Sequence, residues 1–178
     1  MKHLLLIRFS ALGDVAMLVP VVASLMKQYP DIHVTVLSKP FARSLFEGLS
    51  PNVSFMSADL KKDYQGLSGL NALYRRLAAK NFTAVADMHD VLRTKYLRLR
   101  FHLCGFHVAH IDKHRKGKQL LCSEKNKVRV QQPTSFENYA AVLAKLGYPV
   151  SLEFHSIFGE KGGNLRQLMP LIGEKKKF

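Results

Sequence analysis

The chain has 178 residues, and its 27 Lys and Arg against 13 Asp and Glu give a formal net charge of +14. Because 47% of the residues are hydrophobic, the composition excludes a disordered chain and predicts a globular protein with one full core. The large positive charge predicts an anionic partner, and by itself it fits a nucleic acid, a phosphorylated small molecule or a membrane surface.

Expected strands and helices alternate along the chain. The first strand is expected at 3–9, where the unbroken apolar run HLLLIRF is typical of a strand buried on both faces. A helix follows at 14–29, and Pro20 inside it is expected to bend it because proline lacks a backbone donor. Further strands are expected at 31–38, 52–57, 82–88 and 106–111, and further helices at 40–49, 70–80, 91–103 and 134–147. This alternation predicts the α/β class, with a Rossmann-like parallel sheet and helices on both faces.

The last helix has the clearest start signal, with Thr134 or Ser135 as its N-cap and Glu137 close behind. Before it, residues 112–133 lack periodicity and are expected to form a basic loop or excursion. Between residues 91 and 129 the chain has eleven Lys or Arg and two acidic residues, which gives +9 of the total of +14. This basic tract fits an acidic lipid or a sugar phosphate, or it is a plain solvated surface. No readable nucleic-acid motif is evident in it, so nucleic acid is not the expected partner.

The turn after the first strand is the first candidate site, because ligands of an open parallel sheet meet the carboxyl ends of its strands. A nucleotide cradle needs the pattern GxGxxG, of which this turn has only the last glycine, Gly13. Asp14 stands at a helix N-terminus, where the macrodipole and the free amides favour its ionised form. Such a carboxylate either caps the helix or, facing a cleft, accepts a proton from a sugar hydroxyl or binds a cation.

The second candidate is the segment DMHDVLR, where Asp87, His89 and Asp90 fall at the end of an expected strand. Arg93 lies four residues after His89, so the two share a face if the helix starts early. A His that binds hydroxyls and an Arg that binds phosphate or carboxylate suit a polar, anionic ligand. The alternative is that Asp90 caps the helix and the basic residues behind it are solvated.

Other reactive side chains form no recognisable site. A metal site is not expected, because a strand turns residues 107 and 110 to opposite faces and the spacing matches no ligand set; the residues concerned are His102, Cys104, His107, His110 and His114. Serine hydrolysis is not expected, because no GxSxG pattern surrounds Ser10 or Ser44. Cys104 and Cys122 suggest neither a disulfide framework nor a zinc site, which fits a reducing cytoplasm.

Four segments together resemble the N-terminal half of glycosyltransferase family 9, the heptosyltransferases of lipopolysaccharide inner-core assembly. They are HLLLIRFSALGDVAMLVPVVASL, VTVLSKPFARSLFE, DMHDVLRTKYLR and TSFENYAAVLAKLG. The most specific part is IRFSALGD followed by an apolar helix with an early proline. The resemblance implies half of a GT-B enzyme, in which an N-terminal Rossmann-like domain binds the acceptor and a C-terminal one binds the ADP-heptose donor.

The resemblance also implies roles for particular residues. Asp14 corresponds to the general base of an inverting, metal-independent transfer, which deprotonates the acceptor hydroxyl. The residues that would shape or line the acceptor side are Ser10, Gly13, Arg43, His89 and Arg93. The implied partner is an anionic acceptor of the Kdo and lipid A type, met at the cytoplasmic face of the inner membrane with peripheral membrane contact. This domain is expected to bind no cofactor of its own.

The same resemblance predicts the domain organisation. Residues 1–155 are expected to form the acceptor-binding domain, and residues 156–178 the linker to a second domain. The sequence stops where that second domain would begin. The chain alone is therefore not expected to transfer sugar.

Two other functional classes stay open. One is an NADP-dependent oxidoreductase that uses Ser38, Lys39 and Arg43 for the 2′-phosphate, against which the missing glycines count. The other is a non-catalytic domain that binds an anionic glycolipid or a nucleic acid through residues 91–129. Salt-dependent binding to DNA with no preference for a lipopolysaccharide core would favour the second class.

Overall fold

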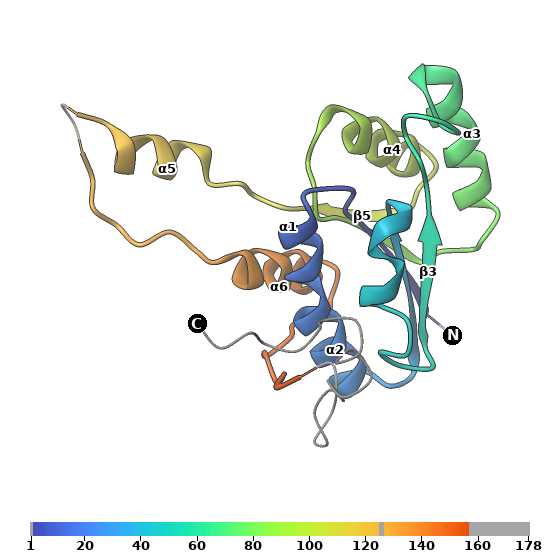
Figure 1. The fold of residues 1–178 in the computed structure, drawn as a ribbon, viewed down its shortest axis with the longest axis horizontal. Coiled ribbons are helices and arrows are strands. Elements are labelled where there is room, and N and C mark those ends of the chain that lie inside the picture. The colour runs from blue at the N-terminus through green and yellow to red at the C-terminus, as the bar shows by residue number, and fades with distance from the viewer. Residues whose placement is uncertain (1, 125–126, 157–178) are drawn as a thin grey trace, which may run out of the picture.

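The structure is a computed structural model that describes residues 2–124 and 127–156, and it confirms the predicted α/β class (Figure 1). The strands are β1 (Lys2–Ile7), β2 (Ile32–Ser38), β3 (Val53–Ser57), β4 (Ala84–Asp87) and β5 (His107–His110). The helices are α1 (Leu12–Ala16), α2 (Leu18–Gln28), α3 (Gly66–Ala78), α4 (Leu92–Leu103), α5 (Arg115–Cys122) and α6 (Ser135–Lys145), with the 3-10 helix η1 (Pro40–Leu45).

The five strands form one parallel sheet in the order β3-β2-β1-β4-β5. The central strand β1 pairs with β2 on one side and β4 on the other, so Ile7 lies opposite both Leu37 and Asp87. The order reverses at β1, which makes the space beyond the carboxyl ends of β1 and β4 the topological switch point of the sheet.

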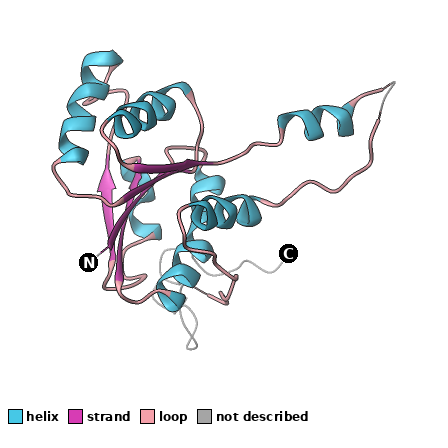
Figure 2. Cartoon of the chain, turned by 180° about the vertical axis from the view of Figure 1, so that it is seen from behind, coloured by secondary structure: helices cyan, strands magenta, loops and turns pink. Residues whose placement is uncertain are grey.

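Helices cover both faces of the sheet, as Figure 2 shows from behind. On one face, Leu4 and Leu6 of β1 pack in a core cluster with apolar residues of α1, α2 and α6. On the other face, Leu5 and Ile7 pack in a second cluster with apolar residues of α3 and α4. Alternate residues of β1 therefore face two separate cores, which explains why its sequence is an unbroken apolar run.

The helix expected at 14–29 is two helices, α1 and α2, separated at Met17. Pro20 lies in the first turn of α2, where its missing amide proton removes no hydrogen bond of that helix. In an unbroken helix its ring would clash with the carbonyl of Ala16, four residues earlier, so the chain breaks between the two. The predicted bend is therefore a complete break. The helix expected at 40–49 is the shorter 3-10 helix η1.

The segment 112–133, predicted to be a loop or excursion, leaves the body of the protein and includes the helix α5 (Figure 1). We call residues 112–124 and 127–134 the arm. None of the α5 residues is buried, so this helix depends on the good helix propensities of its Arg, Lys, Gln and Leu residues. Eight residues are too few to show helical periodicity in the sequence.

In the described part of the chain, no helix is long and apolar enough to span a membrane.

Candidate active site

The site lies where β1 and β4 end side by side. The amide of Arg8 donates to the Leu37 carbonyl at 3.0 Å, and the amide of Met88 donates to the Ile7 carbonyl, also at 3.0 Å. These two bonds continue the sheet past both strand ends, so the segments 8–14 and 88–90 leave it next to each other. The two candidate segments of the sequence are therefore brought together, as the rule for open parallel sheets predicts.

Arg8 is the residue that ties the two segments together. Its side chain is only 9% exposed, and it donates to the Met88 carbonyl at 2.6 Å and forms an ion pair with Oδ2 of Asp14. Its guanidinium also lies over the ring of Tyr139, 5.8 Å from the ring centre. Arg8 was not among the expected site residues, although a charged residue within an apolar run expected to be buried on both faces indicates a buried partner.

Asp14 is both a helix cap and a candidate proton acceptor. Its Oδ2 accepts from the Ala11 amide at 3.2 Å, within the first turn of α1, and from Arg8. Its side chain is 36% exposed, and Oδ1 has no hydrogen-bond partner among the described residues. The carboxylate is therefore held by one oxygen, while the other is left for a ligand.

Tyr139 supports the backbone beneath Asp14. Its hydroxyl donates to the Asp14 carbonyl at 3.0 Å, across 125 residues of sequence. Burial raises the pKa of Tyr139 to about 12, so the phenol keeps the proton that it donates. Sequence reasoning missed this residue, because nothing in its local pattern indicates a partner so far along the chain.

His89 faces the same turn from the β4 side. Its Nε2 lies 3.3 Å from the Ser10 hydroxyl, within hydrogen-bonding distance, and the residue is 9% exposed. Burial lowers the pKa of His89 from its ordinary 6.5 to about 4. The positive charges of Arg8 and Lys113 lower this pKa further, while the carboxylate of Asp14 opposes them. At neutral pH the imidazole is therefore uncharged and is able to donate one hydrogen bond and accept another.

Asp87, the last residue of β4, fixes the turn that presents His89. It is fully buried, and its Oδ1 accepts from the amides of His89 at 3.0 Å and Asp90 at 2.9 Å. Arg98 of α4 pairs with Asp87 at 3.3 Å and with Asp90 at 3.2 Å. The α4 residue that contacts this turn is therefore Arg98. At the start of α4, the side chain that accepts from the backbone is that of Thr94, which binds the Val91 amide, and not that of Asp90.

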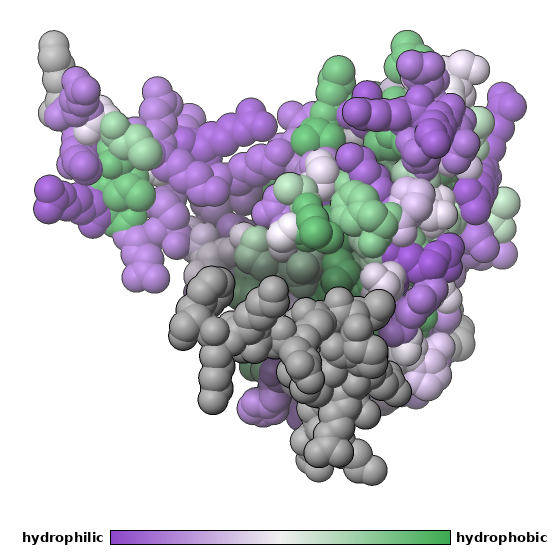
Figure 3. Space-filling view, viewed as in Figure 1, coloured by the Kyte–Doolittle hydropathy of each residue, from purple (hydrophilic) through white to green (hydrophobic). Residues whose placement is uncertain are grey.

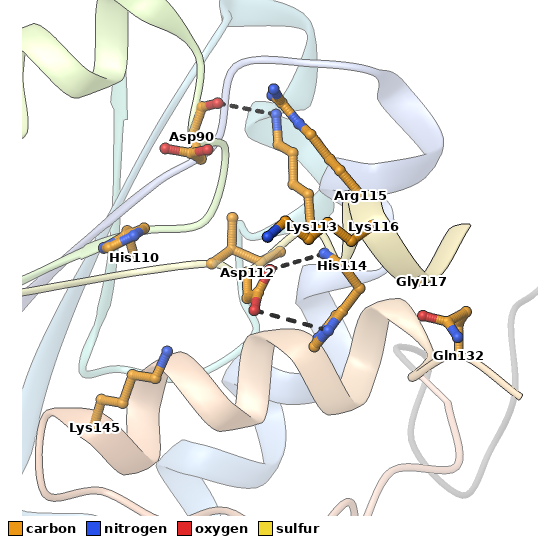
Figure 4. Close-up of a pocket in the computed structure, with 11 residues that line it drawn as sticks. Asp90, His110, Asp112, Lys113, His114, Arg115, Lys116, Gly117, Gln132 and Lys145 are labelled. Carbon is orange, nitrogen blue, oxygen red and sulfur yellow. Dashed lines mark hydrogen bonds and ion pairs between the residues drawn. The ribbon is translucent and has the colours of Figure 1, made fainter. Parts of the chain in front are cut away.

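A pocket of about 590 Å³ opens at the same edge, beside β5, the base of the arm and α6 (Figure 4). Lys113 lies between it and the site, where its Nζ donates to the Asp90 carbonyl at 3.0 Å. Burial lowers the pKa of Lys113, although the Asp90 carboxylate opposes this. The basic and imidazole side chains that line the pocket are His110, Lys113, His114, Arg115, Lys116 and Lys145. Such a lining suits a ligand with phosphate or carboxylate groups.

The other predicted site residues lie in different surroundings. Arg93 is exposed in the first turn of α4, with no hydrogen bond or ion pair to the part of the chain that the structure describes. Arg43 of η1 pairs with Glu47 at 3.5 Å and lies over the ring of Phe55. Gly13 is in α1, and a Cβ added there would meet nothing within 4 Å, so the space beside Asp14 is open. The structure therefore groups Ser10, Gly13, Asp14 and His89.

No metal site is found within residues 2–124 and 127–156. No three His, Cys, Asp or Glu side chains there are arranged to hold a metal ion. Cys104 and Cys122 are both exposed free thiols. His114, one of the histidines considered above, instead forms a hydrogen bond with Asn138 at 3.0 Å.

Comparison with known proteins finds sequence and fold similarity to heptosyltransferases and a family 9 glycosyl transferase. No family model matches the chain. It is similar to the lipopolysaccharide core heptosyltransferase OpsX of Haemophilus influenzae, with 30% identity over 98 residues, which are 55% of this chain and 27% of that protein. Its fold is similar to that of the family 9 glycosyl transferase of Veillonella parvula, with a TM-score of 0.60, 21% identity, and coverage of 87% of this chain and 46% of that one.

A third similar structure is the E. coli heptosyltransferase WaaC with ADP-2-deoxy-2-fluoro heptose, with a TM-score of 0.61 and 17% identity. The match covers 88% of this chain and 52% of that one, so the chain spans about half the length of the solved structures that it matches. These comparisons confirm the predicted fold and the resemblance to family 9 heptosyltransferases.

Proposed function

We propose that residues 1–155 are the acceptor-side domain of an inverting glycosyltransferase similar to the ADP-heptose:lipopolysaccharide heptosyltransferases. The observation that supports this most directly is the Asp14 carboxylate, held by Arg8 at the switch point of the sheet with one oxygen free. The similarity to a lipopolysaccharide core heptosyltransferase supplies the reaction class. In this proposal the ADP-heptose donor is held by a second domain, and residues 156–178 are the linker, nearly all of them outside the described residues.

In the proposed reaction, Oδ1 of Asp14 takes the proton of an acceptor hydroxyl. The hydroxyl oxygen then bonds to the anomeric carbon of the donor sugar, and the bond from that carbon to the diphosphate oxygen breaks. ADP leaves from the opposite face, so the configuration inverts. Arg8 acts as a positioning residue, since it binds Oδ2 and leaves Oδ1 to face the acceptor.

The acceptor would lie along the turn that carries Asp14. Ser10 and the neutral His89 are suited to binding sugar hydroxyls, and Gly13 leaves room for a sugar ring. Arg93, Arg43 and the basic pocket beside Lys113 would bind the carboxylates and phosphates of a Kdo and lipid A type acceptor. Such an acceptor is borne by a lipid, so the domain would work in the cytoplasm, in peripheral contact with the inner face of the inner membrane.

The alternative of a non-catalytic domain is favoured by one observation, the exposed basic arm. That domain would bind an anionic glycolipid or a nucleic acid without a second domain. It would not need the ion pair of Arg8 and Asp14 beyond the carboxyl end of β1. We therefore give the transferase domain precedence.

Acceptor binding by the 178-residue chain tests the proposal. We expect a phosphorylated, delipidated core saccharide containing Kdo to bind in calorimetry, and Arg93→Ala to weaken binding about tenfold or more, because a charge-assisted hydrogen bond is lost. Arg75→Ala, an exposed arginine of α3, is the matched control and should leave the affinity unchanged. Equal affinities for the two variants would remove Arg93 from the site. Tighter binding of duplex DNA than of the saccharide would favour the alternative domain.

A further inference from the structure

The arm presents apolar side chains to solvent at a distance from both cores. Leu120 of α5 is 42% exposed, and Val128 and Val130 of the returning limb are 45% and 58% exposed. The two limbs lie together, because the Val128 amide donates to the Leu120 carbonyl at 3.1 Å. These residues therefore form one apolar strip, which we call the arm strip, and Figure 3 shows hydrophobic side chains gathered on the arm.

Basic side chains flank the arm strip on both limbs. Over residues 112–134 the sequence has seven Lys or Arg and two acidic residues, a net charge of +5. Those that the structure describes as exposed are Arg115, Lys116, Lys118, Lys127 and Arg129. Figure 3 shows the hydrophilic surface around the hydrophobic patch of the arm. Apolar side chains surrounded by cations are the combination that binds a surface of anionic lipids.

Two other partners fit the arm less well. A single-stranded nucleic acid site normally adds aromatic side chains for base stacking, and residues 112–134 contain no Phe, Tyr or Trp. A second copy of the chain would bring two arms of the same strong positive charge together, which opposes association. An anionic bilayer carries the opposite charge at its surface, and its apolar interior lies directly beneath that surface.

We propose that the arm docks this protein on an anionic lipid bilayer. Leu120, Val128 and Val130 enter the headgroup region, and the flanking Lys and Arg side chains contact lipid phosphates. Each contribution alone is weak, and stable attachment takes both. This inference deepens the proposed function. It rests on that function only for the purpose of docking, which is to reach an acceptor carried by a lipid.

The position of the arm agrees with that use. The arm begins directly after β5, at the carboxyl edge of the sheet that also holds Asp14, and its base lines the basic pocket of Figure 4. A bilayer bound at the arm is therefore on the same side of the molecule as the pocket. An acceptor carried by that bilayer would reach Asp14 without passing around the sheet.

Vesicle sedimentation with the full chain tests the docking. Vesicles of phosphatidylcholine mixed with phosphatidylglycerol are expected to bind the protein, and vesicles of phosphatidylcholine alone are not. Lys116→Gln with Lys118→Gln should weaken binding roughly 30-fold, because each of the two lysines removed would otherwise contribute a similar share of the electrostatic attraction to the anionic surface. Leu120→Ser with Val128→Ser should weaken it about tenfold or more. Added salt should weaken the binding of the wild-type protein.

Matched controls lie on α3 and in the loop before it. Lys61→Gln with Lys62→Gln removes two exposed lysines, and Leu67→Ser removes a leucine that is 68% exposed. Both should bind vesicles as the wild-type protein does. Circular dichroism should show all variants folded, since the replaced side chains are exposed.

The proposal is overturned if the wild-type protein does not sediment with anionic vesicles, if it binds neutral vesicles equally, or if the arm variants bind as the controls do. It is also overturned if the arm variants change only the oligomeric state, which would make a second copy the partner of the arm. The vesicles contain no sugar acceptor, so this result does not depend on the acceptor-binding measurement. Either proposal can therefore fail while the other stands.

Discussion

Arg8 is the residue on which the geometry of the candidate site depends most. It contacts the Asp14 carboxylate, the Met88 carbonyl and the Tyr139 ring, which come from three separate parts of the chain. The sequence places Asp14 and His89 at strand ends, so their meeting was predictable from the topology rule. Arg8 gave one local signal, a charge within the apolar run expected as a strand at 3–9, whereas Tyr139 gave none, because a contact across 125 residues leaves no local pattern in the sequence.

Replacing Arg8 should destabilise the protein and loosen the site. Arg8→Gln leaves the Asp14 carboxylate without its ion pair and the Met88 carbonyl without a charged donor, so we expect a loss of about 1–3 kcal/mol in the free energy of unfolding. Urea denaturation measures this loss of unfolding free energy. The control is Lys27→Gln, which breaks an ion pair with Glu153 in which both side chains are at least half exposed; that change should stay within about 0.5 kcal/mol. Equal effects of the two variants would show that the contacts of Arg8 stabilise the fold no more than an exposed ion pair does.

His89 gives the stability a specific pH dependence. The folded state lowers the pKa of His89 from 6.5 to about 4, chiefly by burial, so between these values the unfolded chain binds the proton more strongly. The contribution is fully present above pH 6.5, falls as the pH drops toward 4 and does not change further below that. As the pH falls from 6.5 to about 4, the unfolding free energy of the wild-type protein should therefore decrease relative to that of His89→Gln, which has no group titrating at this position. Parallel curves would contradict the lowered pKa.

At the scale of elements, the strands were the most predictable part. All five lie within the expected ranges or shift by one residue at the ends, because runs of buried apolar residues are the strongest signal in a parallel sheet. The helices differed from the expected ranges where local steric clashes determine the helix ends, as at the break between α1 and α2. The arm helix α5 was missed because its eight residues are too few to show helical periodicity in the sequence.

The start of α6 is an element boundary that supports the site, since α6 holds Tyr139 beneath Asp14. The side chain of Thr134 accepts from the Glu137 amide at 3.3 Å, as the N-cap predicted from the sequence. Thr134→Ala should lower the free energy of unfolding by about 1 kcal/mol, measured by urea denaturation. Ser68→Ala, an exposed serine inside α3, is the control and should change it by less than about 0.5 kcal/mol. A neutral effect of Thr134→Ala would mean that the cap does not stabilise α6.

At the scale of the whole molecule, three features share one edge of the sheet. The basic pocket, the arm and the site all lie beyond the carboxyl ends of the strands. The sequence predicted both the concentration of charge and the edge of the sheet where ligands bind, but not that the two coincide. That coincidence depends on where the arm leaves the sheet, which only the three-dimensional structure establishes.

The central claim is that Asp14 is the general base of a sugar transfer, and the most direct test is the activity of Asp14→Asn with a donor-binding domain supplied. We expect transfer to fall by about 10²- to 10⁴-fold, because the proton acceptor is lost. The affinity for the acceptor should stay unchanged, since asparagine keeps the size and an oxygen for Arg8. Asp31→Asn, an exposed acid outside the site, should transfer normally. Transfer by Asp14→Asn at the wild-type rate would contradict the account.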